Sequence, residues 1–193
     1  MKHLPFDALM ELESGVIDEA SQVINRRLSD MPSFFHDQDA VQAQLEEDPV
    51  LYRTYVKQNP ISSSLWNIGS SVIEPGTVGN EYFMTKGHFH LKEEAPEVYF
   101  TVSGSGRLLL QKHSGEIEVK KMAPGVINYI PGGWAHRTVN VGEKPLIFFA
   151  VWPADAGHNY GAIEEMGFSR LVVNDRGVPK IIDNPRYAPG LAK

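Results

Sequence analysis

The sequence contains no cysteine. This absence excludes disulfide bonds, thiolate catalysis and sulfur ligation, so a metal site would need histidine, carboxylate, backbone or water ligands. Long apolar runs are also missing, because no stretch approaches the ~20 residues that a membrane-spanning helix requires. Acidic residues interrupt the first fifteen positions too early for a secretory signal. We therefore expect a soluble, cytoplasmic protein without a membrane partner.

Basic side chains are outnumbered, with 18 lysines and arginines against 24 acidic residues and a formal net charge of -6. Nucleic acid is not an expected partner, because its phosphates attract strongly basic surfaces. The same charge argues only weakly against one small phosphate ester. The 193 residues, 42% of them hydrophobic, are sufficient for one domain with a substantial core and an appended segment.

The first part of the chain differs from the rest. Residues 1–60 contain segments that favour helical or irregular structure, with Asp37 or Asp39 as helix N-caps and Pro49 and Pro60 as breakers. We predict that these residues form an N-terminal arm that packs on the remainder of the molecule.

Short apolar segments separated by glycine and proline follow from Ser62 onward, at a spacing of roughly ten residues. This pattern is typical of an all-β sandwich or barrel. Turns are expected at Ser114-Gly115 and, near the C-terminus, around Arg176. We predict a β-barrel formed by residues 61–193, with a C-terminal extension.

Four metal-compatible side chains occur within this β-rich part. His88 and His90 share one face of an expected strand over 81–90, because side chains alternate with period two. Glu97 opens the next apolar run, and His136 follows a glycine turn. Three imidazoles and a carboxylate suit Fe, Mn, Ni, Co or Zn better than Ca or Cu(I). A single histidine in an apolar strand, however, is more often a satisfied core or surface residue.

The spacing around His136 strengthens the metal interpretation. The segment from Gly125 through Pro131, Gly133 and His136 to Asn140 resembles the second motif of the cupins, Gly-x5-Pro-x-Gly-x2-His-x3-Asn, at every fixed position. This resemblance implies an all-β cupin jelly-roll barrel, also called a double-stranded β-helix, with one metal ion near its centre.

The first cupin motif is matched less fully. Gly87 precedes His88 directly, but Tyr82 stands where the motif has its first glycine, and six residues separate His90 from Glu97 where three or four are usual. The later spacing from Glu97 to Gly104 fits again.

A narrower resemblance covers the chain from about Arg26 to about Arg186. The strings RRLSDM, TKGHFH, AHRTVN and WPADAGHNYG are similar to those of the cupin-type phosphoglucose isomerases. This resemblance implies interconversion of glucose 6-phosphate and fructose 6-phosphate, with a sugar phosphate as the binding partner. The expected cofactor is one divalent metal ion, Fe²⁺ first, with Mn²⁺, Ni²⁺, Co²⁺ or Zn²⁺ as alternatives. Proton transfer through a metal-chelated cis-enediolate and a hydride shift both remain open.

The resemblance also implies roles for individual residues, with His88, His90, Glu97 and His136 as metal ligands. The implied catalytic residues are Glu97, Tyr99 and His158. Ligation should weaken Glu97 as a base, Tyr99 shares its inward parity, and His158 lies in an expected loop over the barrel mouth. The implied substrate-binding residues are Ser71, Thr85, Gly87 and Tyr160. A core position for Tyr99 with a satisfied hydroxyl is the alternative.

Other polar residues receive structural or surface interpretations. Arg137 and Asn140 are expected to be structural, and Lys86 a solvated neighbour of the site. The remaining histidines have no other candidate metal ligand at a motif-like spacing and are expected at the surface: His3, His36 and His113.

The chain departs from these relatives at two places. They carry Pro-Tyr where this sequence has Gly132-Gly133, and Tyr where it has Trp152. Each change removes a phenol, so we expect the phosphate end of the site to differ.

Two other functional classes stay open. Three histidines and a glutamate also suit an Fe(II)-dependent cupin dioxygenase, and a non-catalytic sugar- or metal-binding cupin would use the same barrel. In each case a homodimer is expected, because small barrels often protect sheet edges against a second copy.

Overall fold

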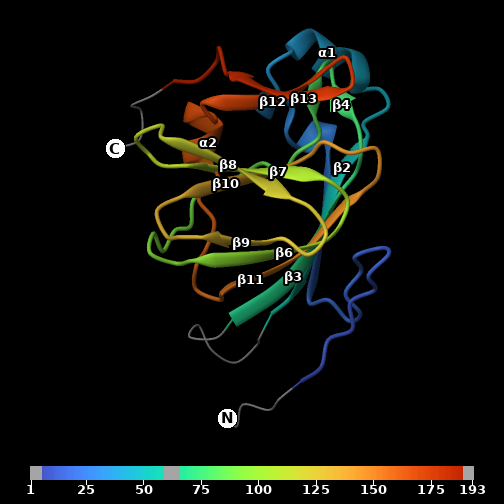
Figure 1. The fold of residues 1–193 in the computed structure, drawn as a ribbon, viewed down its shortest axis with the longest axis vertical. Coiled ribbons are helices and arrows are strands. Elements are labelled where there is room, and N and C mark those ends of the chain that lie inside the picture. The colour runs from blue at the N-terminus through green and yellow to red at the C-terminus, as the bar shows by residue number, and fades with distance from the viewer. Residues whose placement is uncertain (1–5, 59–65, 189–193) are drawn as a thin grey trace.

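The computed structural model describes residues 6–58 and 66–188, which form mainly antiparallel β-strands (Figure 1). The predictions for His3, Pro60 and Ser62, and the expected division of the chain at residue 60, fall outside the described residues. The strands of the main sheet are β1 (Gln22–Arg27), β2 (Val50–Lys57), β3 (Trp66–Ile73), β6 (Glu97–Ser103), β9 (Ile127–Ile130) and β11 (Leu146–Pro153).

Two smaller sheets complete the β-structure. Their strands are β4 (Thr77–Val78), β5 (Glu81–Tyr82), β7 (Gly106–Gln111), β8 (Ile117–Met122), β10 (Ala135–Asn140), β12 (Arg170–Asp175) and β13 (Val178–Asp183). The helices are short: 3-10 turns η1 (Leu28–Asp30) and η2 (Pro32–Phe34), and α-helices α1 (Gln38–Gln44) and α2 (Gly161–Met166). No helix in the described ranges combines the length and the apolar character needed to cross a membrane.

The sheets enclose a barrel. The six-stranded sheet has the order β1-β2-β3-β11-β6-β9, and the three-stranded sheet, β10-β7-β8, lies across the interior from it (Figure 1). A four-stranded sheet, β13-β12-β5-β4, lies with α1 at one end of the molecule. The predicted all-β cupin jelly-roll architecture is confirmed.

The secondary structure expected for the N-terminal arm is only partly correct. Asp37 caps α1 by accepting a hydrogen bond from the Ala40 amide at 3.0 Å, as predicted. The segments 22–27 and 50–57, expected to be helical or irregular, are instead strands β1 and β2 of the main sheet. In β1 the inward-facing positions are Ile24 and Arg26, so an inward arginine interrupts the apolar alternation that would have identified a strand.

Two predicted hairpins are present and one predicted strand is interrupted. The β7–β8 hairpin turns at Ser114-Gly115, and the β12–β13 hairpin turns around Arg176, which has a positive φ of 56°. The strand expected over 81–90 is reduced to β5 and isolated bridges at Met84, His88 and Phe89. Gly87 breaks it with φ +73°, a conformation that extended strands do not use.

Candidate active site

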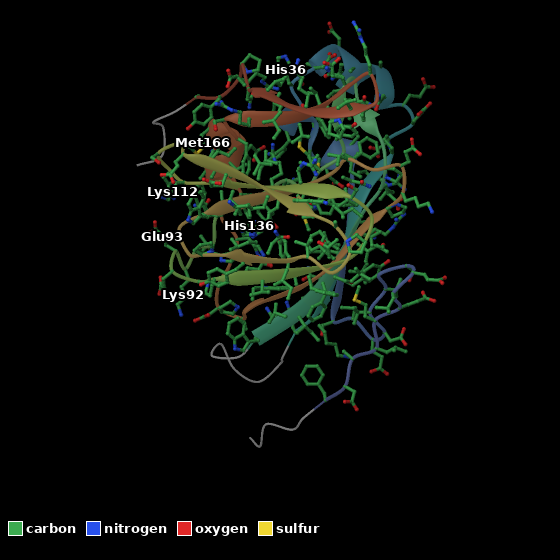
Figure 2. The ribbon with its side chains drawn as sticks, in the orientation of Figure 1. His36, Lys92, Glu93, Lys112, His136 and Met166 are labelled. Carbon is green, nitrogen blue, oxygen red and sulfur yellow. The ribbon has the colours of Figure 1, made fainter. Side chains whose placement is uncertain are left out.

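A cavity of about 380 Å³ opens between the main sheet and the facing segments 85–88 and 158–160. The inward faces of β1, β2, β3, β6 and β11 form one wall. The opposite wall contains Thr85, Gly87, His88, His136, His158 and Tyr160. In Figure 2, His136 lies in the interior between the two barrel sheets, whereas Lys92, Glu93 and Lys112 lie at the periphery. The cavity therefore extends inward to the predicted metal ligands.

The structure brings the four predicted metal ligands together. His88 and His136 face each other across an isolated antiparallel bridge, with the His88 amide donating to the His136 carbonyl at 3.3 Å and the reverse bond at 3.1 Å. Glu97, the first residue of β6, points inward and is 6% exposed. One potential ligand atom from each of His88, His90, Glu97 and His136 lies within 4.8 Å of the other three.

Backbone carbonyls orient two of the imidazoles. Nδ1 of His90 donates to the Ala95 carbonyl at 2.8 Å, and Nδ1 of His136 donates to the Trp134 carbonyl at 3.4 Å. Such bonds turn Nε2 of each ring toward the cluster, where it can bind a metal ion once it carries no proton. The Nε2 atoms of His88, His90 and His136 are buried and have no hydrogen-bond partner. Buried nitrogens without partners are costly unless a ligand is present, so this donor set fits a divalent transition metal.

The carboxylate of Glu97 completes the cluster. Its Oε2 lies 3.0 Å from Nε2 of His136 and 3.3 Å from Nε2 of His90. Burial alone would raise the pKa of Glu97, but the contacts with His136 and His90 outweigh it and lower the pKa to about 2. The carboxylate is therefore ionised at neutral pH, as a metal ligand must be.

Tyr99 and His158 lie next to the cluster: the Tyr99 ring is 6.0 Å from the His136 ring. Tyr99 is buried, and burial together with the Glu97 charge raises its pKa well above the usual value, so its hydroxyl remains protonated. The ring of His158 lies 4.4 Å from that of His88 and stacks on Tyr160 at 5.7 Å. Burial lowers the pKa of His158, which keeps its imidazole neutral at pH 7. Both residues line the cavity.

The expected phosphate-binding residues also reach the cavity. Ser71 on β3 exchanges a 2.9 Å hydrogen bond with Thr54 on β2. Thr85 accepts a hydrogen bond from the Thr138 amide at 3.0 Å. A side chain on Gly87 would meet Phe168 at 2.7 Å and the His136 carbonyl at 3.0 Å, so only glycine fits there. Small hydroxyls and backbone amides of this kind can bind an anion.

Sequence reasoning missed the contribution of the two N-terminal strands. Arg26 on β1 and Tyr52 and Thr54 on β2 line the same cavity, as does Asn67 on β3. Of these residues only Arg26 carried a signal in the sequence, because it belongs to the string RRLSDM. The helical or irregular structure expected for this part of the chain gave no reason to place the others near the metal ligands.

The residues interpreted as structural have structural contacts. Asn140 is fully buried and donates to the carbonyls of Ile73 and Lys144, each at 2.9 Å. Arg137 donates to the Lys86 carbonyl at 2.7 Å and lies 4.5 Å from the Phe168 ring centre. Lys86 is half-buried and does not line the cavity.

His36 and His113 are exposed, as expected. His113 also stacks on the Phe89 ring at a centroid distance of 3.8 Å.

The departures from the related sequences fall in different environments. A side chain on Gly132 would meet the Glu94 backbone at 2.6 Å, so the long spacer between His90 and Glu97 packs against this glycine. Trp152 lines the cavity and packs over Gly69, where an added Cβ would lie 2.9 Å from the indole ring. Trp152 pairs with Asn67, four residues along β3 from Ser71, and thus lies away from the expected phosphate contacts.

The antiparallel barrel and its inward cluster of three histidines and one glutamate define a cupin with a site able to hold a metal ion. Residues 25–188 match the model of the family described as glucose-6-phosphate isomerase (GPI). The chain belongs to this family.

Relatives from the genera Thermococcus and Pyrococcus match nearly the whole chain. Glucose-6-phosphate isomerase from Thermococcus litoralis is 47% identical over 95% of this chain and 96% of its own length. The enzyme of the same name from Pyrococcus furiosus is 45% identical over 95% of this chain and 97% of its own. Among solved structures, oxalate decarboxylase from Bacillus subtilis overlays with a TM-score of 0.45 and 22% identity, over 55% of this chain and 26% of that one.

Proposed function

We propose that this protein is a metal-dependent aldose-ketose isomerase that interconverts glucose 6-phosphate and fructose 6-phosphate. The observation that carries the proposal is the convergence of four ligand atoms within 4.8 Å, beside an open cavity, in a member of this family. The proposed cofactor is one divalent ion held by His88, His90, Glu97 and His136. Fe²⁺ is the first expectation, with Mn²⁺, Ni²⁺, Co²⁺ and Zn²⁺ as alternatives.

The ion, when bound, would supply an electrophile that polarises the carbonyl of the open-chain sugar. The protein must also move a proton beside that carbonyl. Glu97, with a pKa of about 2, is a weak base. We propose that the neutral imidazole of His158 accepts the proton, and that the protonated hydroxyl of Tyr99 donates a hydrogen bond to a sugar oxygen.

The substrate phosphate is proposed to bind to hydroxyl and amide donors that line the cavity. Ser71 and Thr85 would donate from their hydroxyls, Gly87 from its amide and Tyr160 from its phenol. These neutral groups supply hydrogen-bond donors to the phosphate oxygens, and the protein need not bury a charged side chain to form them.

An anaerobic assay of fructose 6-phosphate conversion, with the metal content measured on the same sample, tests this function. We expect turnover that follows metal occupancy across Fe, Mn, Ni, Co and Zn. Absence of conversion by the metal-loaded protein, freed of contaminating isomerase, would contradict the proposal. Oxygen uptake with a diol or enediol substrate and no anaerobic turnover would instead indicate a dioxygenase, and sugar binding without either reaction a binding protein.

We further propose that the protein is a cytoplasmic homodimer. A contiguous apolar patch on the outer face of the main sheet supports this assembly. The patch consists of Val98, Phe100, Ile127, Tyr129, Phe149 and Val151. Sedimentation of the purified protein tests the oligomeric state.

A further inference from the structure

Arg26 is a cavity residue whose charge has no acidic partner in the described part of the chain; its side chain neighbours the phenol of Tyr52. Its backbone lies on β1, paired with Tyr52 of β2, and its side chain lines the cavity. The guanidinium Nε is buried and makes no hydrogen bond, and none of the ion pairs within 6–58 and 66–188 includes Arg26. Arg26 is half-buried, and a buried donor of a charged group without an acceptor is costly, so an anion at this position would stabilise it.

The neighbours of Arg26 reinforce this point. Lys86 lies close enough that, after burial, the charge of Arg26 is the largest influence lowering the lysine pKa. Arg26 and Lys86 are therefore close in space, although only Arg26 lines the cavity. Tyr52 does not neutralise them, because burial raises its pKa to about 12 and its phenol stays protonated. The acidic residues that act on Lys86, Glu164 and Asp30, are outside the cavity lining.

The sheet register places Arg26 beside the expected phosphate contacts. Thr54 pairs with Ile24 on one side and with Ser71 on the other, so one row of the sheet connects β1 to Ser71. Arg26 is the next inward-facing residue after Ile24 on β1. It is thus about 7 Å further along the strand direction and two strands, about 10 Å, from the Ser71 backbone. A long arginine side chain that points into the cavity can reach the space between them.

We propose that the Arg26 guanidinium binds the phosphoryl group of the substrate, as the cationic member of a subsite otherwise made of hydroxyls and amides. The inference rests on the proposed function. The planar array of N–H donors on the Arg26 guanidinium matches the oxygens of a dianionic phosphate monoester better than a single ammonium group does. Arg26 therefore positions the substrate and takes no part in the proton transfer.

The test compares Arg26→Gln with Arg26→Lys and with the adjacent control Arg27→Gln. Arg27 is exposed, and its side chain donates to the Asp48 carbonyl at 2.7 Å outside the cavity lining. For each full-length protein we would measure KM and kcat for fructose 6-phosphate, the inhibition constant of inorganic phosphate, metal content and thermal unfolding. Removing a charge-assisted phosphate contact should raise KM and the phosphate inhibition constant about 10- to 100-fold in Arg26→Gln. Because this interaction is equal in ground and transition states, kcat should change little.

Arg26→Lys should recover part of the lost affinity, and Arg27→Gln should resemble the wild type. The inference is overturned if Arg26→Gln keeps wild-type KM and phosphate inhibition, or if metal content and kcat fall together with KM and Arg26→Lys restores nothing. Calorimetric titration with inorganic phosphate separates this inference from the proposed function. Phosphate binding that is lost in Arg26→Gln and kept in Arg27→Gln would support the subsite even in a protein without isomerase activity, whereas a wild type that binds no phosphate would overturn it.

Discussion

At the scale of single residues, the convergence of the four proposed metal ligands could be predicted from the sequence because local rules fix the direction of their side chains. Strand parity places the side chains of His88 and His90 together, and the cupin spacing identifies His136. The carbonyl that orients His90 belongs to Ala95, in the unusually long spacer before Glu97. No sequence rule gives the conformation of that spacer, so the hydrogen bond that frees Nε2 could be found only in the structure.

Replacing one ligand should remove the metal and the activity together. In His136→Ala we expect metal affinity to fall by more than the roughly 10- to 100-fold that loss of an outer hydrogen-bond partner costs, because one of four protein ligands is gone. Metal content after dialysis and isomerase turnover are measured on the same sample. His36→Ala is the control, since His36 is exposed and outside the cavity lining. Full turnover and wild-type metal content in His136→Ala would contradict the assigned ligand set.

Glu81 should make the fold less stable as the pH rises from 4.5 to about 7. The residue is 2% exposed, its Oε1 has no partner, and burial raises its pKa from 4.5 to about 7. Between these values the folded state binds more protons than the unfolded state, so unfolding free energy falls with increasing pH, by up to about 3 kcal/mol at pH 7 and above. Below pH 4.5 the penalty is absent, because both states are protonated.

Glu81→Gln should therefore raise the thermal midpoint at pH 8 and change it little at pH 4.5, because the amide keeps the size of the side chain without its charge. Unfolding scans across this pH range measure the difference. Glu143→Gln, at an exposed position, provides the control. An equal effect of Glu81→Gln at both pH values would show that charge is not the cause.

At the scale of secondary-structure elements, the sequence predicts hairpins well and cavity walls poorly. The turns at Ser114-Gly115 and around Arg176 carry local signals that survive in the structure. The inward face of β1 carries Arg26 because it borders a polar cavity, and this breaks the apolar alternation by which half-buried strands are identified. Gly87 likewise breaks the expected strand over 81–90 where the backbone approaches His136.

Asn140 should be the main polar connection between β3 and the turn after β10. Its amide donates to the Ile73 and Lys144 carbonyls, and its carbonyl oxygen accepts from the Gly142 amide at 2.9 Å. Asn140→Ala would leave these buried groups without partners, which should lower the free energy of unfolding by about 2–4 kcal/mol. Denaturant unfolding measures this change. Asn25→Ala, exposed on β1, should cost far less, and equal losses in the two variants would contradict the proposed role.

At the scale of the whole molecule, the second cupin motif was sufficient to predict the barrel, but the composition of its cavity was not predictable. The cavity joins β1 to Tyr160, residues separated by most of the chain. Such contacts depend on the register of successive strand pairs, and an error of one residue would turn every side chain to the other face. The outer surface of the main sheet presents the same difficulty, because apolar residues in strands are expected in the core.

That outer surface leads to the prediction about assembly. Phe100 pairs with Ile127 on one side and Phe149 on the other, and Val98 pairs with Tyr129 and Val151, so these residues form two adjacent apolar rows. Ile127 and Tyr129 are 67% and 62% exposed. Elsewhere the same face is covered, because Gly15 of the N-terminal segment packs on Val72 and Ile147. An uncovered apolar patch that extends to the edge strand β9 suits a two-fold symmetric contact with a second copy of the chain.

Phe100→Lys introduces a positive charge into this apolar surface and should convert the proposed dimer to a monomer. A two-fold interface places the new ammonium on both subunits, and each would be buried against apolar side chains without a partner. Sedimentation velocity at micromolar concentration should give twice the chain mass for the wild type and a single chain mass for the variant. Val178→Lys, at a 64% exposed position on β13, should remain dimeric. A monomeric wild type, or a Phe100→Lys protein as dimeric as the wild type, would show that this apolar patch is not a dimer interface.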